Sequence, residues 1–368
     1  MKKRLGISIY PEFSKESENI KYIETAAKHG FNLLFLAFLS LKDDRETIIK
    51  RYKPITDYAK KLGYEIICDV NPTVLDKLGV NISMFKGKLD LSFFTDLNID
   101  VMRLDVGMSE IEEAFLSNNS SGIKICMNAY MAYDHIGSFL TAGGNPEAVI
   151  GCHNYYPHRY TGISYDHFVK GSMNYVNHNI RLQSFVSSQS EEAFGPYPIT
   201  EGLPTLEMHR NWKIETQIKH YIMTGLVDDI LIGNCFATED ELKRASEANT
   251  EKVTFNINLV DGLPENMAEH LNMDILSRRQ DENDYLIRTL ESRLFTSGEI
   301  KPFNTVDIHR GDVLIENCLY GQYAGEISIA LQEMKNSGKT NVVGHLLPEE
   351  VELLPYLKGG QQFCFKFE

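Results

Sequence analysis

The 368-residue sequence lacks the features that would place the chain in a membrane or on nucleic acid. It has no apolar run of about 20 residues, the length that a membrane-spanning helix needs. The basic start, MKKR, precedes an apolar run that is too short for a secretion signal, with no small-residue cleavage site. Lys and Arg number 37 against 51 Asp and Glu, and the net charge of -14 is unfavourable for binding a phosphate backbone. We therefore expect a cytoplasmic protein, with neither nucleic acid nor membrane as its partner.

The usual motifs of metal, redox and dinucleotide sites are also missing. The six cysteines show no CxxC spacing and lie mostly within apolar runs, which indicates buried thiols in a reducing compartment. No HExxH occurs, the first apolar run carries no HxH, and no GxGxxG follows it. We expect no cofactor and no bound metal.

From Arg4 to about Thr250, short apolar runs alternate with amphipathic segments. The eight runs are RLGISIY, FNLLFLAF, YEIICDV, DVMRLDV, GIKICMN, AVIGCHN, IRLQSFV and DDILIGN. Helical patterns occupy residues 15–28, 44–62, 165–178, 206–223 and 238–248. This alternation is typical of parallel strands covered by helices, as in a barrel or an open doubly wound sheet. Eight units in about 250 residues, without the glycine motif, predict a closed (β/α)8 TIM barrel.

The remaining sequence has a different pattern. Its strand-like segments are KVTFNINLV, DYLIRTLESR, GDVLIENCLYG, GEISIALQEM and QQFCFKF, and one short helical candidate covers residues 347–357. Gly, Asn, Asp and Pro separate these segments, which is typical of antiparallel strands. The sequence thus predicts a barrel domain at residues 1–248 and a smaller, mostly antiparallel β domain at residues 253–368.

Two aspartates end neighbouring strands of the predicted barrel, where TIM-barrel active sites lie. Asp69 ends the third apolar run and Asp105 the fourth. Since adjacent strands lie about 4.8 Å apart, the carboxyl groups could approach the roughly 5–5.5 Å separation of retaining glycosidases. Arg103 shares a strand face with Asp105 and would keep a nearby carboxylate ionised. The alternative is that both aspartates merely cap helices or loops.

Three glutamates are further candidates. Glu12 follows the first strand beside aromatic residues, which suits either a sugar ring or plain loop packing. Thr205 is expected to cap a helix that has Glu207 in its first turn, where the helix dipole favours a carboxylate. Glu201 precedes that cap and has no such local role, which makes it the stronger candidate for catalysis or hydroxyl binding.

The segment GCHNYYPHRYTG, residues 151–162, follows the sixth strand. We expect His153 and Asn154 to face the rim of the barrel, and Tyr155 and Arg159 to belong to a substrate loop. Arg159 is a planar donor that suits an anionic group. Asn71 and Asn128, at the ends of the third and fifth strands, add amide groups to the rim. A metal site would instead require His153 and His158 to join Asp69 or Asp105.

Phosphate often binds TIM barrels after the seventh and eighth strands. Here Thr238 and Glu241 form an expected capping box there, and the acids of that turn would repel phosphate. An arginine-based anion site is therefore the better hypothesis. The second domain offers possible closing groups over the rim, although each also reads as an ordinary surface charge: Arg279, Arg288, Arg293 and Arg310.

Six segments in this order resemble the MupG-type bacterial 6-phospho-N-acetylmuramidases: ISIYPE, CDVNP, MRLDVG, GCHNYYPHRYTG, EGLPTLEMHR and GDVLIEN. The resemblance implies a TIM barrel followed by a cyclophilin-like β-barrel domain. It also implies hydrolysis of the β-1,4 bond between 6-phospho-N-acetylmuramic acid and N-acetylglucosamine during cytoplasmic peptidoglycan recycling. The rim that it implies consists of Glu12, Asp69, Asp105, Asn128, His153, Asn154, Arg159 and Glu201.

From the residues, Asp69 and Asp105 are expected to be the catalytic pair, with Glu201 and Glu12 in reserve. The expected substrate is a phosphorylated amino-sugar disaccharide, whose anionic groups Arg159 and one second-domain arginine such as Arg310 would bind. Two alternatives stay open on sequence alone. One is a metal-dependent sugar-phosphate barrel enzyme, and the other is a sensor that binds the phosphosugar without cleaving it.

Overall fold

The computed structural model describes residues 2–39, 41–86, 89–106, 108–131, 133–196, 200–295 and 298–367. Contacts divide the chain into two units. One comprises residues 2–218 and 226–247, and the other comprises residues 219–225 and 248–368 together with residue 1. No helix of the described segments is long and apolar enough to cross a membrane.

The first unit is built on a closed barrel of eight parallel strands, each paired with the next and the last with the first. The strands are β1 (Arg4–Ile9), β2 (Leu33–Ala37), β3 (Glu65–Val70), β4 (Val101–Leu104), β5 (Lys124–Asn128), β6 (Val149–Cys152), β7 (Leu182–Val186) and β8 (Asp229–Ile232). All are almost entirely buried, as expected when helices cover a parallel sheet. The predicted TIM barrel is confirmed.

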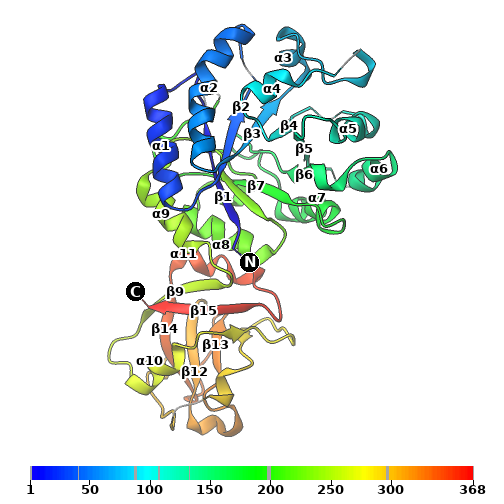
Figure 1. Ribbon diagram of the computed structural model, residues 1–368. Helices are drawn as coiled ribbons and strands as arrows, with labels where there is room; N and C mark the ends of the chain where they lie inside the picture. The colour runs from blue at the N-terminus through cyan, green and yellow to red at the C-terminus, as the bar shows by residue number, and fades with distance from the viewer. Residues whose placement is uncertain are drawn as a thin grey trace. The chain divides into compact units, whose positions relative to one another are not determined.

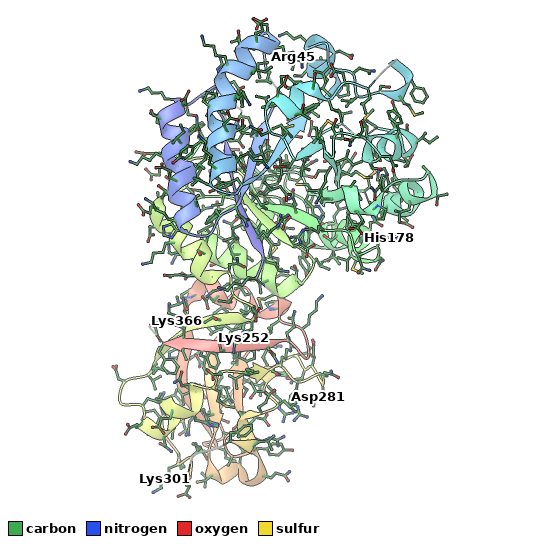
Figure 2. The ribbon with its side chains drawn as sticks, viewed as in Figure 1. Arg45, His178, Lys252, Asp281, Lys301 and Lys366 are labelled. Carbon is green, nitrogen blue, oxygen red and sulfur yellow. The ribbon has the colours of Figure 1, made fainter. Side chains whose placement is uncertain are left out.

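The helices that follow the strands surround the barrel (Figure 1). They are α1 (Glu16–Lys28), α2 (Arg45–Lys61), α3 (Pro72–Lys77), α4 (Ser92–Asp96), α5 (Glu110–Ser117), α6 (His135–Thr141), α7 (Tyr165–Val176), α8 (Ile214–Thr224) and α9 (Glu239–Ala248). Side chains fill the interior, while Arg45 and His178 lie at the periphery of this unit (Figure 2).

The predicted helix at residues 206–223 is wrong in its first half. A short 3-10 turn at Glu207–His209 precedes α8, which begins at Ile214. Thr205 does not cap a helix, because its hydroxyl donates to the carbonyl of Asn154 and accepts from the amide of Phe185. The capping box of α9 is confirmed: the Glu241 amide donates to the Thr238 hydroxyl, and the Thr238 amide donates to the Glu241 carboxylate.

A charged layer closes the barrel at the amino ends of its strands. Arg4 donates to Glu65 at 3.0 Å and to Asp229 at 2.7 Å, and Gln183 also donates to Asp229 at 3.1 Å. These contacts join four strands across the interior. Because TIM-barrel chemistry takes place at the opposite end, this layer stabilises the barrel.

The second unit contains one seven-stranded sheet in the order β10-β15-β9-β14-β12-β13-β11. Its elements are β9 (Val253–Leu259), α10 (Glu265–Leu271), β10 (Leu276–Ser277), β11 (Leu286–Arg288), β12 (Asp312–Glu316), β13 (Ile327–Ala330), β14 (Thr340–Leu346), α11 (Pro348–Val351) and β15 (Gln362–Phe367). Every pairing is antiparallel except that of β15 with β9. The prediction of a mostly antiparallel sheet is confirmed, but β14, near its centre, was not predicted.

Candidate active site

A pocket of about 140 Å³ lies at the carboxyl ends of the barrel strands. It is lined by Leu39, Asp69, Arg103, Asp105, Asn154, Tyr155, Tyr156 and Pro157. These residues follow or end strands β2, β3, β4 and β6, so residues far apart in sequence meet at one rim. Of the predicted site residues, the pocket brings together Asp69, Asp105, Asn154 and Tyr155. Tyr156 and Pro157 belong to the loop predicted after the sixth strand, whereas Leu39 was not predicted to lie at the site.

Arg103 is the centre of this site. Its side chain is only 2% exposed, and its Nη1 atom lies 2.5 Å from Oδ1 of Asp69 and 3.4 Å from Oδ1 of Asp105. Its Nη2 atom donates to Asn128 Oδ1 at 2.7 Å and to the side-chain oxygen of Asn154. A planar guanidinium can hold several oxygens in fixed directions. Arg103 therefore fixes the positions of both aspartates.

Register places these groups on the inner face of the barrel. Asp69 on β3 is the direct partner of Arg103 on β4, and partners in adjacent strands share a face. Asn128, at the end of β5, donates to the carbonyls of Leu104 and Asp105 while its side-chain oxygen binds Arg103. Asn128 thus supports the site from beneath and does not line the pocket described above.

The two aspartates differ in their surroundings. The side chain of Asp69 is 1% exposed and that of Asp105 is 34% exposed. Burial raises the pKa of Asp69 to about 7, although the nearby charge of Arg103 opposes the rise. The sequence-based expectation that Arg103 would keep a neighbouring carboxylate firmly ionised is therefore incomplete for Asp69. A carboxyl group with a pKa near 7 can both give and accept a proton at neutral pH.

An upper limit follows for the separation of the two carboxyl groups. One oxygen of each lies against the same Arg103 nitrogen, so these oxygens can be no farther apart than the sum of the two distances, about 5.9 Å. Retaining glycosidases have carboxyl groups about 5–5.5 Å apart, and inverting enzymes about 6.5–9.5 Å. The separation of these two carboxyl oxygens is therefore below the range of inverting enzymes and is compatible with that of retaining enzymes.

His153 lies away from the pocket. Consecutive strand residues point to opposite faces, so with Asn154 directed inward, His153 packs outward against α7. Its Nε2 atom lies 2.9 Å from the hydroxyl of Ser172, and its ring contacts Phe168. Burial lowers the pKa of His153 to about 3, so the ring is neutral. The expectation that His153 faces the rim is corrected by this placement.

Asn71 and Glu12 both have contacts within the protein. Asn71 caps α3, accepting from the amide of Val74 at 2.9 Å and donating to the carbonyl of Leu39 at 3.2 Å. Glu12 accepts a hydrogen bond from Tyr52 on α2, and burial raises the pKa of its carboxyl group. Neither side chain lines the pocket.

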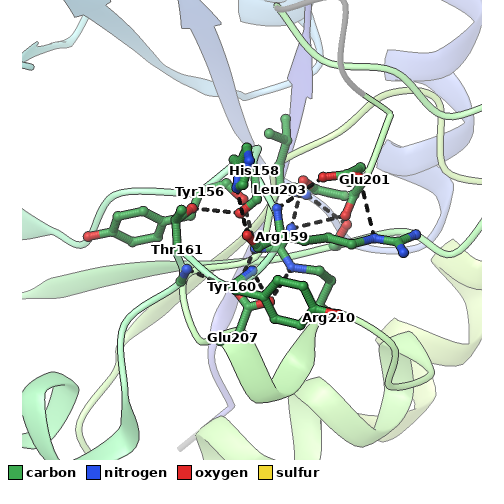
Figure 3. A network of polar contacts seen from close by, with 12 residues as sticks. Tyr156, His158, Arg159, Tyr160, Thr161, Glu201, Leu203, Glu207 and Arg210 are labelled. Carbon is green, nitrogen blue, oxygen red and sulfur yellow. Dashed lines mark hydrogen bonds and ion pairs between the residues drawn. The ribbon is translucent and has the colours of Figure 1, made fainter.

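The loops after β6 and β7 are joined by a polar network (Figure 3). Both oxygens of Glu207 are engaged: they accept from the amides of Tyr160 and Gly162, each at 2.8 Å, and from Arg210. The hydrogen bonds from Arg210 lower the pKa of Glu207 to about 2. Glu207 is therefore a charged structural group.

Arg310 belongs to the second unit. Its Nη1 atom lies 3.7 Å from Oε1 of Glu352, and the residue lines a surface pocket of that unit with Arg278 and Asp284.

The metal hypothesis finds no support in the geometry of the described residues. Within the described parts of the chain, no three His, Cys, Asp or Glu side chains are grouped so that they could hold an ion. His158 is exposed in its loop, and His153 lies behind the strand.

A closed (β/α)8 barrel with two carboxyl groups in a pocket at the carboxyl ends of its strands has the architecture of a TIM-barrel glycoside hydrolase. Two family models match the chain, described as the N-terminal part of 6-phospho-N-acetylmuramidase at residues 5–247 and its C-terminal part at residues 253–366. The chain belongs to the 6-phospho-N-acetylmuramidase family, whose members are glycoside hydrolases.

Two solved structures have the same fold over nearly the whole chain. The crystal structure of an uncharacterized B. cereus protein is 36% identical, with both chains covered over 100% and a TM-score of 0.89. A conserved protein of unknown function from Enterococcus faecalis is 22% identical, with coverage of 99% and 96% and a TM-score of 0.71, and it shares the fold. A search of curated proteins finds no match.

Proposed function

We propose that the chain hydrolyses the β-1,4 bond between 6-phospho-N-acetylmuramic acid and N-acetylglucosamine, in cytoplasmic recycling of cell-wall fragments. Membership of the family supports the phosphorylated muramic acid substrate. The observation that carries the chemistry is the meeting of Asp69 and Asp105 on one nitrogen of Arg103 inside the pocket.

Asp69 acts as the general acid and Asp105 as the nucleophile or stabilising carboxylate. The general acid of a glycosidase needs a raised pKa, which burial gives Asp69. Asp105 is the more exposed of the two, and its Oδ1 atom lies 3.4 Å from Nη1 of Arg103, which holds it at the open side of the pocket. The short separation of the two groups supports a double displacement. Asp105 attacks the anomeric carbon while the glycosidic C–O bond breaks and Asp69 protonates the departing oxygen of N-acetylglucosamine. Asp69 then takes a proton from water, which breaks the bond between Asp105 and the anomeric carbon and releases 6-phospho-N-acetylmuramic acid.

The pocket is small for a disaccharide, so the loops around it contribute the remaining contacts. Phe35, Tyr155 and Phe185 form edge-to-face contacts beneath the opening, with ring centroids 5.0–6.2 Å apart. Such a packed aromatic floor holds Tyr155 in place against the pocket. A sugar ring can pack on an aromatic surface while its hydroxyl groups bind Asn154 and the carboxylates.

The test is an assay of the phosphorylated disaccharide in metal-free buffer, with the variants Asp69→Asn and Asp105→Asn. Each should lower kcat by roughly a hundredfold or more, the usual contribution of acid–base catalysis. Asp166→Asn is the matched control, because Asp166 is an exposed carboxylate in the first turn of α7. Near-normal turnover by both active-site variants would show that Asp69 and Asp105 are not the catalytic pair.

Two arms of the same assay separate the alternatives. Activity that is lost with a chelator and restored by added metal would favour a metal-dependent enzyme. Tight binding of intact disaccharide, with no product after prolonged incubation, would favour a sensor. Cleavage that is insensitive to chelator supports the proposed hydrolase.

A further inference from the structure

The loops after β6 and β7 are held together by Arg210. Its Nη1 atom donates to the carbonyls of Glu201 and Gly202, and its Nη2 atom donates to the carbonyls of Tyr156 and His158. Glu207 also links the two loops, because its carboxylate accepts hydrogen bonds from Arg210 and from the amides of Tyr160 and Gly162 in the β6 loop. A buried guanidinium with this many partners makes the two loops one rigid support.

This support holds a residue in an unfavourable backbone conformation. Tyr160 has a φ of 67°, a region that bulky residues rarely adopt, and its amide is held by Glu207. Tyr160 is 87% exposed, so burial of its side chain does not offset the unfavourable backbone conformation. Strain of this kind is often found where a loop is shaped for a ligand. Arg159 is the preceding residue.

Arg159 is held on one side only. Its amide donates to Oε2 of Glu201 at 3.0 Å, and its Nε atom lies 3.5 Å from Oε1 of the same carboxylate. Figure 3 shows the two side chains facing each other. The Nη1 and Nη2 atoms have no hydrogen-bond partner among the described residues, and the side chain is 57% exposed. The guanidinium thus presents an oriented pair of free donors.

We propose that Arg159 binds an oxyanion of the substrate through Nη1 and Nη2, and that Glu201 is the positioning residue that aims it. Arg159 does not itself line the pocket, but Pro157, two residues earlier in the same loop, does, so the proposed anion site lies outside the pocket on the loop at its edge. This inference rests on the proposed function and refines it. Glu201, which the sequence suggested as a catalytic candidate, then has no part in proton transfer.

Two groups of the expected substrate have the required chemistry, its phosphate and its lactyl carboxylate. A guanidinium binds either through two parallel hydrogen bonds. Three small probes distinguish them by calorimetric titration of the full chain: N-acetylglucosamine 6-phosphate, N-acetylmuramic acid and N-acetylglucosamine. The wild-type protein should bind one of the two anionic probes at least tenfold more tightly than the neutral sugar. Arg159→Gln should abolish that preference. Arg244→Gln removes a partly exposed arginine on α9 that pairs with Asp240 and Glu215, and it should leave the preference unchanged.

Kinetics on the phosphorylated disaccharide test the role of Glu201. Glu201→Gln keeps an oxygen for the Arg159 amide and removes a negative charge beside the anion, so KM should stay the same or fall with kcat unchanged. Glu201→Ala releases the side chain of Arg159, so KM should rise by about three- to tenfold, again with kcat unchanged. If Glu201 were a catalytic acid or base, both variants would lose kcat by about a hundredfold or more.

The outcomes separate this inference from the proposed function. Retention of the anion preference by Arg159→Gln, or a collapse of kcat in Glu201→Gln, overturns the role given to this pair even if the wild-type protein cleaves the disaccharide. Failure of the wild-type protein to cleave overturns the proposed function, while the three-probe titration still reports on Arg159.

Discussion

Replacing Arg103 by methionine should destabilise the barrel unit strongly. The change leaves Asp69 buried, at 1% exposure, without the cation that contacts it at 2.5 Å. Removing one partner of a buried ion pair typically costs about 3–5 kcal/mol, because the remaining group must either stay buried as an unpaired charge or take up a proton. For a domain of about 250 residues, each kcal/mol lowers Tm by roughly 2–4 °C. We therefore expect Arg103→Met to lower the Tm by about 6–20 °C, measured by circular dichroism.

Two further variants check the reasoning behind that magnitude. Arg159→Met breaks an exposed ion pair, with side chains 57% and 36% exposed, and such pairs contribute about 1 kcal/mol or less. Its Tm should fall by no more than about 4 °C. The double variant Asp69→Asn with Arg103→Met leaves no buried charge and should regain part of the lost stability. Equal effects of the two arginine variants, or a double variant less stable than Arg103→Met alone, would refute the argument.

Three other predictions concern pH and stereochemistry. If Asp69, with its pKa of about 7, supplies the proton, kcat/KM should fall as pH rises above about 7, and Asp69→Asn should lack that limb. The lowered pKa of His153 means that the folded state resists a proton that the unfolded state accepts below about 6.5. Its stabilisation is complete above that pH and is lost as pH falls toward about 3, so His153→Gln should flatten acid unfolding followed by fluorescence. Finally, proton NMR should detect the β-anomer of 6-phospho-N-acetylmuramic acid first, whereas initial α-anomer would show inversion.

The barrel could be predicted because its eight buried runs repeat a simple local pattern. The strand β14 could not, since its residues Thr340–Leu346 are buried on both faces near the centre of the second sheet and include Gly344. They show neither alternation nor a long apolar run, the two signals from which strands are recognised.

The first residue of α8 was predicted wrongly for a different reason. Residues 205–210 read as helical, but Thr205, Glu207 and Arg210 use their side chains to hold loops.

The aspartate pair was accessible from sequence because strand order and register are simple in a closed barrel. Asp69 and Asp105 end neighbouring strands, and that adjacency is what the structure shows. Strand alternation would also have separated His153 from Asn154, since consecutive residues cannot both point inward. The contacts of Arg210 with four carbonyls depend on how two loops fold together, and no local sequence pattern encodes them.

The joining of the β6 and β7 loops has a consequence for protein engineering. A designer who grafted residues 155–162 onto another barrel would move the peptide groups that Arg210 and Glu207 bind, but would leave both of those side chains behind. The grafted loop would lose its conformation, because the amide of Tyr160, whose φ is 67°, would no longer be held by Glu207. The smallest transferable module therefore consists of two separate stretches of chain, residues 155–162 and 201–210, taken together.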